Sequence, residues 1–219
     1  MKKVSAQKAV ALIEDGAVIM IGGFMSNGTP EILISALIEK GVKDLTVISN
    51  DSGTPDTGIG RLVGAGAVKK LITSHIGLNP LAGKLLNEGK MEVQLVPQGT
   101  LAEQIRAGGA GLGGVLTPTG LGTEIENGKD VIEVDGRKYL LEKPLKADFA
   151  LIRASVADER GNIFYKATTR NFNPIMATAA KTVIAAAEEI VGINEIQPEA
   201  VVTPGIFIDF LVGGEPYVS

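Results

Sequence analysis

The chain has 219 residues, of which 45% are hydrophobic and 4% aromatic, and its formal net charge is −4. This length allows one large α/β domain with a full core, and a mainly aliphatic core is typical of a parallel sheet covered on both faces. The absence of cysteine excludes disulfides and cysteine-ligated metals, and the dispersed basic residues form no face for nucleic acid.

Helix and strand signals alternate through the first half of the chain. Apolar periodicity and capping residues predict helices over residues 5–14, 30–40, 80–87 and 100–107, and strands over residues 18–21, 45–49, 68–73 and 91–96. Gly108-Gly109 is expected to stop the last of these helices. Because helices of this size separate the strands, we expect right-handed crossovers and a mostly parallel sheet.

A segment at about residues 124–143 breaks this rhythm. Asn127-Gly128 and Asp135-Gly136 are tight-turn pairs beside short alternating runs, which predicts a β-hairpin excursion. Further strands are predicted in ADFALIRA, GNIFYKA and KTVIAAA, with a short helix over residues 174–180. Because no linker or repeat interrupts the chain, we expect a single three-layer α/β domain over residues 1–219.

No apolar run is long enough to span a bilayer, and the first residues lack the apolar core of a signal peptide. We therefore expect a cytoplasmic protein that has no membrane partner. His75 is the only histidine, which argues against a zinc site and against a Ser-His-Asp hydrolase. A solvent-facing or structural role is favoured for His75, and no metal is expected.

The first predicted strand runs directly into a glycine-rich turn, in VIMIGGFMSNGTP over residues 18–30. Glycines allow backbone amides to approach a ligand closely, and ligands bind beyond the carboxyl ends of parallel strands. Thr29 is expected to cap the next helix, with Pro30 in its first turn, so that free amides at the helix start face an anion. The alternative is that the glycines only allow close packing of helix and sheet, and both interpretations remain open.

Two other segments carry weaker signals. A GxGxxG match at Gly109, Gly111 and Gly114 follows a helix instead of a strand, so a nicotinamide dinucleotide site is discounted and a glycine loop beside the site is preferred. The run NDSGTPDTG, residues 50–58, follows a strand and is either an active-side loop or a turn cluster with capping side chains. The second interpretation is slightly favoured.

Gln98 follows the predicted strand 91–96 in VPQGT. Chain direction places its amide at the carboxyl edge of the sheet, where an uncharged donor and acceptor could hold a carbonyl or a carboxylate. The alternative is a surface or capping glutamine.

Several segments together resemble one known family. DGAVIMIGGFMSNGTP, over residues 15–30, matches the first signature of the family I coenzyme A transferases at every fixed position. The segments SNDSGTPDTGIG, SHIGLNP, PQGTLAEQIRAGGAGLGG, LTPTGLGT, GNIFYKATTRNFNP and VTPG are similar to its α subunit of the acetate/butyrate–acetoacetate type. The resemblance covers nearly the whole chain.

The resemblance implies an α subunit that works with a β subunit, commonly as an α2β2 heterotetramer. Such enzymes move coenzyme A between an acyl-CoA and a short-chain carboxylate by ping-pong chemistry, with the thioester as substrate and no cofactor. The nucleophile in the family is a glutamate in a Ser-Glu-Asn-Gly motif of the β subunit, which forms an acyl anhydride and then a glutamyl-CoA thioester. This chain is therefore expected to lack the nucleophile.

The resemblance also implies site residues. Gln98 falls on the family glutamine that orients the acyl carbonyl or the attacking carboxylate, and Gly108, Gly109 and Gly111 fall on a glycine loop near the same cleft. Asn171, Phe172 and Asn173 match the family without an assigned role. The coenzyme A-associated signature falls on Gly22, Gly23, Phe24, Met25, Ser26, Asn27 and Gly28.

The segment Glu126-Asn127-Gly128 matches part of the family's Ser-Glu-Asn-Gly motif. Ile125 stands where the family has serine, and charged residues follow where it has aliphatic ones. We therefore assign Asn127-Gly128 to a turn and Glu126 to solvent. The main rival function is a stand-alone sugar-phosphate isomerase of related fold, which would need acid–base residues that the sequence scarcely supplies.

Overall fold

Aliphatic strands and amphipathic helices alternate through residues 6–110 and form one half of a parallel sheet. The structure is a computed structural model that describes residues 1–215. The strands of this half are β2 (Val18–Ile21), β3 (Leu45–Ile48), β4 (Val68–Thr73) and β5 (Glu92–Leu95), which lie side by side in that order. The helices are α1 (Ala6–Val10), α2 (Glu31–Lys40), α3 (Ile59–Gly64), α4 (Pro80–Asn87) and α5 (Gln98–Ala110).

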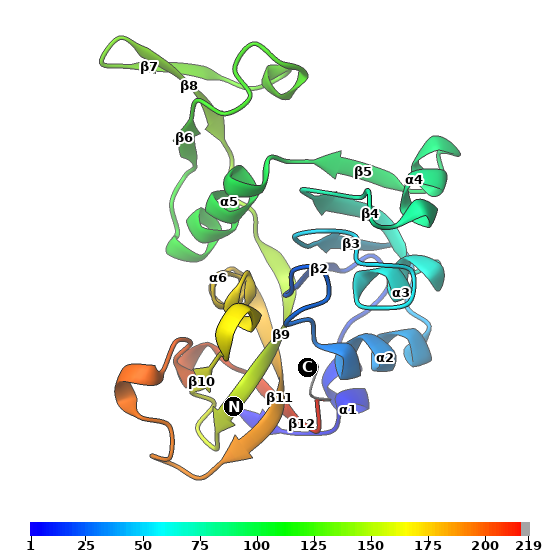
Figure 1. Cartoon of the computed structure of the whole chain (residues 1–219), viewed down its shortest axis with the longest axis vertical. Coiled ribbons are helices and arrows are strands. Elements are labelled where there is room, and N and C mark those ends of the chain that lie inside the picture. The colour runs from blue at the N-terminus through cyan, green and yellow to red at the C-terminus, as the bar shows by residue number, and fades with distance from the viewer. Residues whose placement is uncertain (216–219) are drawn as a thin grey trace.

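The second half of the chain completes the sheet on the other side of β2. Its strands are β9 (Ala147–Asp158), β11 (Ala180–Val191) and β12 (Phe210–Gly213), joined by β1 (Lys2–Lys3) at the edge. The order β1-β12-β11-β9-β2-β3-β4-β5 is parallel throughout, and only β10 (Ile163–Phe164) pairs antiparallel, with β9 (Figure 1). The predicted α/β fold with a mostly parallel sheet is confirmed.

Two hydrophobic clusters cover the two faces of this sheet. Strand β2 shows the alternation, because Ile19 and Ile21 join the cluster under α1, α2 and α3 whereas Met20 joins the cluster under α5 and α6 (Asn173–Thr178). All three side chains are fully buried. The helices therefore form layers on both faces. The short 3-10 helices are η1 (Glu124–Glu126), η2 (Ala167–Arg170), η3 (Pro198–Ala200) and η4 (Gly205–Phe207).

The excursion is an antiparallel sheet that projects away from the main sheet (Figure 1). Strands β7 (Val131–Val134) and β8 (Arg137–Glu142) form the predicted hairpin. Asp135 and Gly136 have φ values of 50° and 74°, as a two-residue hairpin turn with both centres left-handed requires. The sequence did not predict the third strand, β6 (Val115–Thr117), which pairs with β8.

Helix α5 extends beyond the predicted residues 100–107 at both ends. Helix α5 does not stop at Gly108-Gly109 but continues to Ala110, with Gly111 as its left-handed C-cap at φ 71°. A β-carbon at Gly108 would overlap the carbonyl oxygen of Leu145, and one at Gly109 would overlap Thr178 Oγ1. These glycines therefore allow α5 to approach α6 and the segment before β9, and they do not form a loop.

Helix α1 covers residues 6–10 and not 5–14. The Lys40 ammonium at the end of α2 donates hydrogen bonds to the carbonyl oxygens of Val10, Ala11 and Ile13. Lysine contacts thus replace the helical bonds that a longer helix would make. Among the described residues, no helix combines the length and apolarity needed to cross a membrane.

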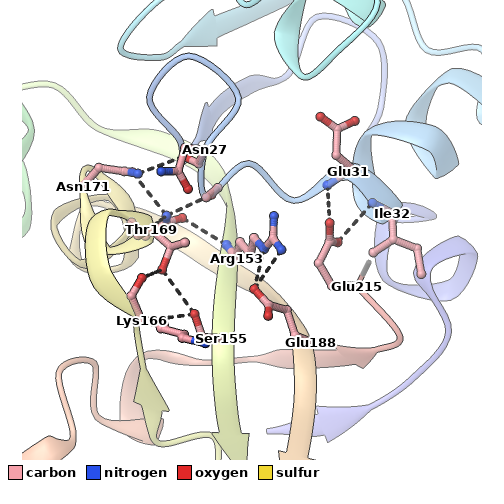
Figure 2. A network of polar contacts seen from close by, with 12 residues as sticks. Asn27, Glu31, Ile32, Arg153, Ser155, Lys166, Thr169, Asn171, Glu188 and Glu215 are labelled. Carbon is pink, nitrogen blue, oxygen red and sulfur yellow. Dashed lines mark hydrogen bonds and ion pairs between the residues drawn. The ribbon is translucent and has the colours of Figure 1, made fainter. Parts of the chain in front are cut away.

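The start of α2 also differs from the expectation. Pro30 is the N-cap, and no side chain of that residue or of Thr29 caps the helix. The carboxylate of Glu215, just after β12, accepts hydrogen bonds from the amides of Glu31 (2.8 Å) and Ile32 (3.1 Å) (Figure 2). The anion at this helix start is therefore a side chain of the same chain. Burial raises the pKa of Glu215 to about 7.

We predict that Glu215 makes the folded chain less stable as pH rises toward neutrality. The pKa of Glu215 is about 7 in the folded state and near 4.5 in the unfolded state. Its contribution to the free energy of unfolding is therefore fully present below pH 4.5 and is lost as pH rises through about 7. The free energy of unfolding should fall by up to about 3 kcal/mol across this window.

Chemical denaturation at pH 5 and pH 8 measures this effect. Glu215→Gln, which does not ionise, should show a smaller difference between the two pH values than the native chain. The exposed Glu199 supplies the control, and Glu199→Gln should behave like the native chain. An unchanged pH dependence in Glu215→Gln would show that burial does not raise this pKa.

Candidate functional site

The carboxyl ends of β2, β3 and β5 lie at one edge of the sheet, and each leads into a polar segment. Residues 22–28 follow β2, residues 49–53 follow β3, and Gln98 follows β5 as the first residue of α5. Side-chain hydrogen bonds join these three segments, as described below. The expected position of Gln98 at the carboxyl edge is confirmed, and the residue is exposed.

The tip of the glycine loop is a tight turn formed by non-glycine residues. Phe24 and Asn27 exchange two backbone hydrogen bonds of 2.9 Å, and between them Met25 and Ser26 have φ values of 47° and 68°. Two successive left-handed residues define a type I′ turn, which usually contains glycine or asparagine. The turn presents exposed Phe24 and Met25 side chains at the edge of the sheet.

The glycines of this loop allow close contact with other parts of the same chain. A β-carbon at Gly22 would overlap the Oδ1 atom of Asn173, and one at Gly23 would overlap Thr29 Oγ1. Gly23 also has a φ of 124°, and Gly28 has a φ of 75°. Gly23 therefore combines a positive φ with an approach too close for a β-carbon.

Most amides of this loop already have partners within the chain. The amide of Gly22 donates to Leu151 O (2.9 Å), that of Gly23 to Asn171 Oδ1 (3.2 Å) and that of Met25 to Asp51 Oδ2 (2.8 Å). These amides are therefore not available to bind an anion. The loop offers a ligand its shape and its exposed tip more than a row of backbone donors.

Two asparagines support the loop from beneath. Asn173 is fully buried, accepts a hydrogen bond from the Arg153 amide (3.0 Å) and donates to the carbonyl oxygens of Gly28 (3.0 Å) and Thr169 (2.8 Å). Asn171 donates to the carbonyl oxygen of Asn27 (2.9 Å; Figure 2). The structure thus gives both residues a supporting role that the sequence did not reveal.

A buried ion pair lies next to the two asparagines. Arg153 is 1% exposed and donates to Glu188 Oε1 through Nε (3.1 Å) and Nη2 (2.8 Å) (Figure 2). Beside it, Ser155 Oγ accepts a hydrogen bond from the Lys166 amide (2.9 Å). The ion pair joins β9 to β11, and the Ser155 contact holds the start of η2 against β9. Asn171 and Asn173 follow η2 and reach the loop from there.

The segment after β3 connects the glycine loop to Gln98. Asp51 is 5% exposed, and its carboxylate accepts hydrogen bonds from Met25 N (2.8 Å), Asn50 Nδ2 (2.7 Å) and Gly53 N (2.8 Å). Asn50 Oδ1 in turn accepts from Gln98 Nε2 (2.6 Å). The sequence favoured a turn cluster here, but the segment also joins the other two. Its place directly after a buried strand was the available signal.

Of the remaining candidates, His75 adjoins this cluster through its backbone and Glu126 lies apart from it. His75 is exposed, as expected, and its carbonyl oxygen accepts a hydrogen bond from Ser52 N. Glu126 lies in the excursion and is partly exposed, and its carboxylate accepts a hydrogen bond from the Gly122 amide (2.6 Å), so it faces solvent as expected but is not free of protein contacts. Asn127-Gly128 forms the predicted turn. Within residues 1–215 no group of three or more histidine or acidic side chains could hold a metal ion.

The chemistry available at this edge is hydrogen bonding by neutral amides. Asp51 is buried and already accepts three hydrogen bonds, so its carboxylate is not placed to attack a substrate. Among residues 1–215, Gln98 Oε1 has no hydrogen-bond partner, and one N–H of its amide remains available. The arrangement suits the orientation of a carbonyl or carboxylate and lacks an exposed nucleophile.

This chain is similar to known proteins along nearly its whole length. A family model described as coenzyme A transferase matches residues 3–214. The acetoacetyl-CoA:acetate/butyrate CoA transferase alpha subunit of Clostridium acetobutylicum is 56% identical over 92% of this chain and 93% of its own. The acetate CoA-transferase subunit alpha of Escherichia coli is 53% identical over 96% of each chain.

Solved structures show the same architecture. An acyl-CoA transferase from Escherichia coli O157:H7, in a thioester complex with CoA, has a TM-score of 0.88 and 25% identity, and covers 99% of this chain. Our chain spans 50% of that protein's length. Glutaconate coenzyme A-transferase from Acidaminococcus fermentans, at 21% identity, has a TM-score of 0.84 over 98% of this chain and 76% of its own, which shows the shared fold.

We predict that Gly23→Ala destabilises the chain by about 2–4 kcal/mol, because the added methyl combines a left-handed backbone with overpacking against buried Thr29. Denaturant unfolding measures the loss. Gly83→Ala is the matched control, because Gly83 lies within α4 with open space around its would-be β-carbon, and it should be neutral or slightly stabilising. Equal stability of the two variants would show that the loop relaxes freely.

Proposed function

Because this chain belongs to the coenzyme A transferase family, we propose that it is the α subunit of a transferase that exchanges CoA between short-chain acyl-CoA thioesters and free carboxylates, of the acetate/butyrate–acetoacetate type. The carrying observation is the identity above 50% to two proteins named as α subunits, over more than nine-tenths of both lengths. No finding favours the isomerase or the nicotinamide dinucleotide alternative.

The partner in this proposal is a β subunit that carries the catalytic glutamate. Two observations support it. The relatives are named as subunits, and the chain corresponds to half of a single-chain acyl-CoA transferase. We infer that the β subunit corresponds to the other half and that the two form an α2β2 heterotetramer in the cytoplasm. No cofactor besides the CoA thioester substrate is needed.

The proposed reaction has two symmetrical halves. The partner's glutamate carboxylate attacks the thioester carbonyl, which releases CoA thiolate and leaves an acyl–glutamyl anhydride. The thiolate then attacks the glutamyl carbonyl, giving glutamyl-CoA and the free carboxylate product. An incoming carboxylate reverses both steps, so that a new acyl-CoA leaves and the glutamate is restored.

Each step passes through a tetrahedral oxyanion, and the contribution of this chain is to stabilise and orient it. We propose that Gln98 donates its remaining amide hydrogen to the oxyanion or to the attacking carboxylate, which its free N–H supports. Gly22 to Gly28 are proposed to shape the CoA site, with Phe24 and Met25 exposed at the tip. Neutral donors suit this chemistry, because the leaving groups are a thiolate and a carboxylate, which depart as stable anions and need little acid–base catalysis.

The first functional prediction concerns the isolated chain. It should fold but transfer no CoA and form no CoA thioester on any of its own glutamates, whereas the complex with its partner should exchange CoA among acetate, butyrate and acetoacetate. Mass spectrometry of tryptic peptides after incubation with acyl-CoA detects the adduct. A thioester on Glu126 or any other glutamate of the isolated chain would contradict the division of labour.

A second functional prediction concerns Gln98. In the complex, Gln98→Ala should lower kcat by roughly 10- to 1,000-fold, the range for loss of one hydrogen bond to a developing oxyanion. KM for acyl-CoA should change much less, because the bond strengthens in the transition state. Steady-state kinetics with checks of thermal stability and assembly provide the measurement. Normal kcat with a raised KM would leave Gln98 as a ground-state contact.

A further inference from the structure

Asp51 is the only member of the cluster linking Gln98 to the glycine loop that cannot donate a hydrogen bond. An ionised carboxylate only accepts, whereas an asparagine or glutamine amide accepts at oxygen and donates at nitrogen. Three N–H groups point at Asp51, from Met25, Asn50 and Gly53. The side chain is 5% exposed, so these donors satisfy it in place of water.

Because Asp51 only accepts hydrogen bonds, it fixes the orientations of the Asn50 and Gln98 side-chain amides in turn. Because Asp51 only accepts, Asn50 has to face it with Nδ2 (2.7 Å), which leaves Asn50 Oδ1 on the side of Gln98. Because Oδ1 only accepts, Gln98 has to face Asn50 with Nε2 (2.6 Å). The exposed Oε1 of Gln98 and its second N–H then have defined directions at the edge of the sheet.

We propose that Asp51 is a positioning residue for the transferase reaction: through Asn50 it determines which end of the Gln98 amide faces the substrate. This inference rests on the proposed function of Gln98 and extends it to two buried residues that do not touch the reacting atoms. An amide free to flip would present donor and acceptor alternately to the oxyanion, which only the donor stabilises.

We call the series of side chains Asp51, Asn50 and Gln98 the relay. Hydrogen bonds to the backbone of residue 50 hold the relay in place and do not depend on its side chains. The carbonyl oxygen of Asn50 accepts hydrogen bonds from Ser74 N (3.0 Å) and Ser74 Oγ (2.6 Å). These bonds involve only backbone atoms of residue 50, so Asn50→Ala removes the relay and keeps them. The same variant keeps the bond from Met25 N to Asp51, and it therefore separates the Gln98 arm from the glycine-loop arm.

The kinetic test is a double-mutant cycle in the complex of this chain with its partner subunit. Asp51→Asn and Asn50→Ala should each lower kcat by about 10-fold or more, with a smaller change in KM. In a Gln98→Ala background, neither should lower kcat by more than about twofold, because the amide that they position is gone. An equal loss in both backgrounds would overturn the proposal, since the two residues would then act independently of Gln98.

Asp148→Asn is the matched control. Asp148 also accepts a backbone amide, from Val18 (3.1 Å), but it lies at the amino-terminal ends of β2 and β9, on the far edge of the sheet. Its replacement should leave kcat and KM unchanged. A loss like that of Asp51→Asn would indicate general destabilisation and contradict a positioning role.

A second measurement does not depend on transferase activity. In the ¹⁵N-labelled full chain, the side-chain amide resonances of Gln98, identified by their loss in Gln98→Ala, should shift in both Asp51→Asn and Asn50→Ala and remain in place in Asp148→Asn. Unmoved resonances would overturn the relay even if the variants were inactive. Shifted resonances in a chain whose complex transfers no CoA would retain the relay and reject the proposed function.

Discussion

Strand β2 is hydrogen-bonded in parallel to β9 on one side and to β3 on the other. Because all three strands run the same way, the loop after β2 lies between the segments that β9 and β3 support. Asn173 reaches the loop from α6, which packs against β9, and Asp51 reaches it from the end of β3. The contacts of Asn173 and Asp51 with the glycine loop follow from this ladder.

The contacts around the loop are consistent with the proposed role of this chain, which is to orient groups in a reaction whose nucleophile belongs to a partner. Asn173, Asn171 and Asp51 satisfy the loop from within, so that its left-handed tip is held before any ligand arrives. The Gln98 amide is held by Asn50 in the same way, and a donor fixed in advance needs no reorganisation when charge develops, which is the condition for effective oxyanion stabilisation. In the proposed mechanism, this chain therefore contributes geometry and the partner's carboxylate contributes the bond-forming group.

Much of the fold followed from short-range patterns. The strands over residues 18–21 and 68–73 and the helix over residues 80–87 were predicted to the residue, because apolar runs with clear punctuation define them. The long α5 was cut short because Gly108-Gly109 has the usual signature of a helix end. The two glycines instead allow close contact with Leu145 and Thr178, which is a tertiary relation that local sequence does not encode.

Positions in the site that depend on chain direction could be predicted from the sequence. Contacts between residues far apart in the sequence could not. Gln98 at the carboxyl edge needed only strand polarity. Glu215 at the start of α2 and Asn173 beneath Gly22 involve residues about 150–185 positions apart, and no local pattern announces them. The family resemblance named Asn173 but gave it no role, which only the packed structure supplies.

The most direct test of the central claim, that residues 22–28, residues 49–53 and Gln98 form one CoA-transfer site, is amide hydrogen exchange in the complex with its partner subunit, with and without acyl-CoA. We expect acyl-CoA to slow exchange in all three segments together and to leave the excursion over β7 and β8 unchanged. Protection confined to the excursion, with unaltered exchange around Met25, Asp51 and Gln98, would contradict it.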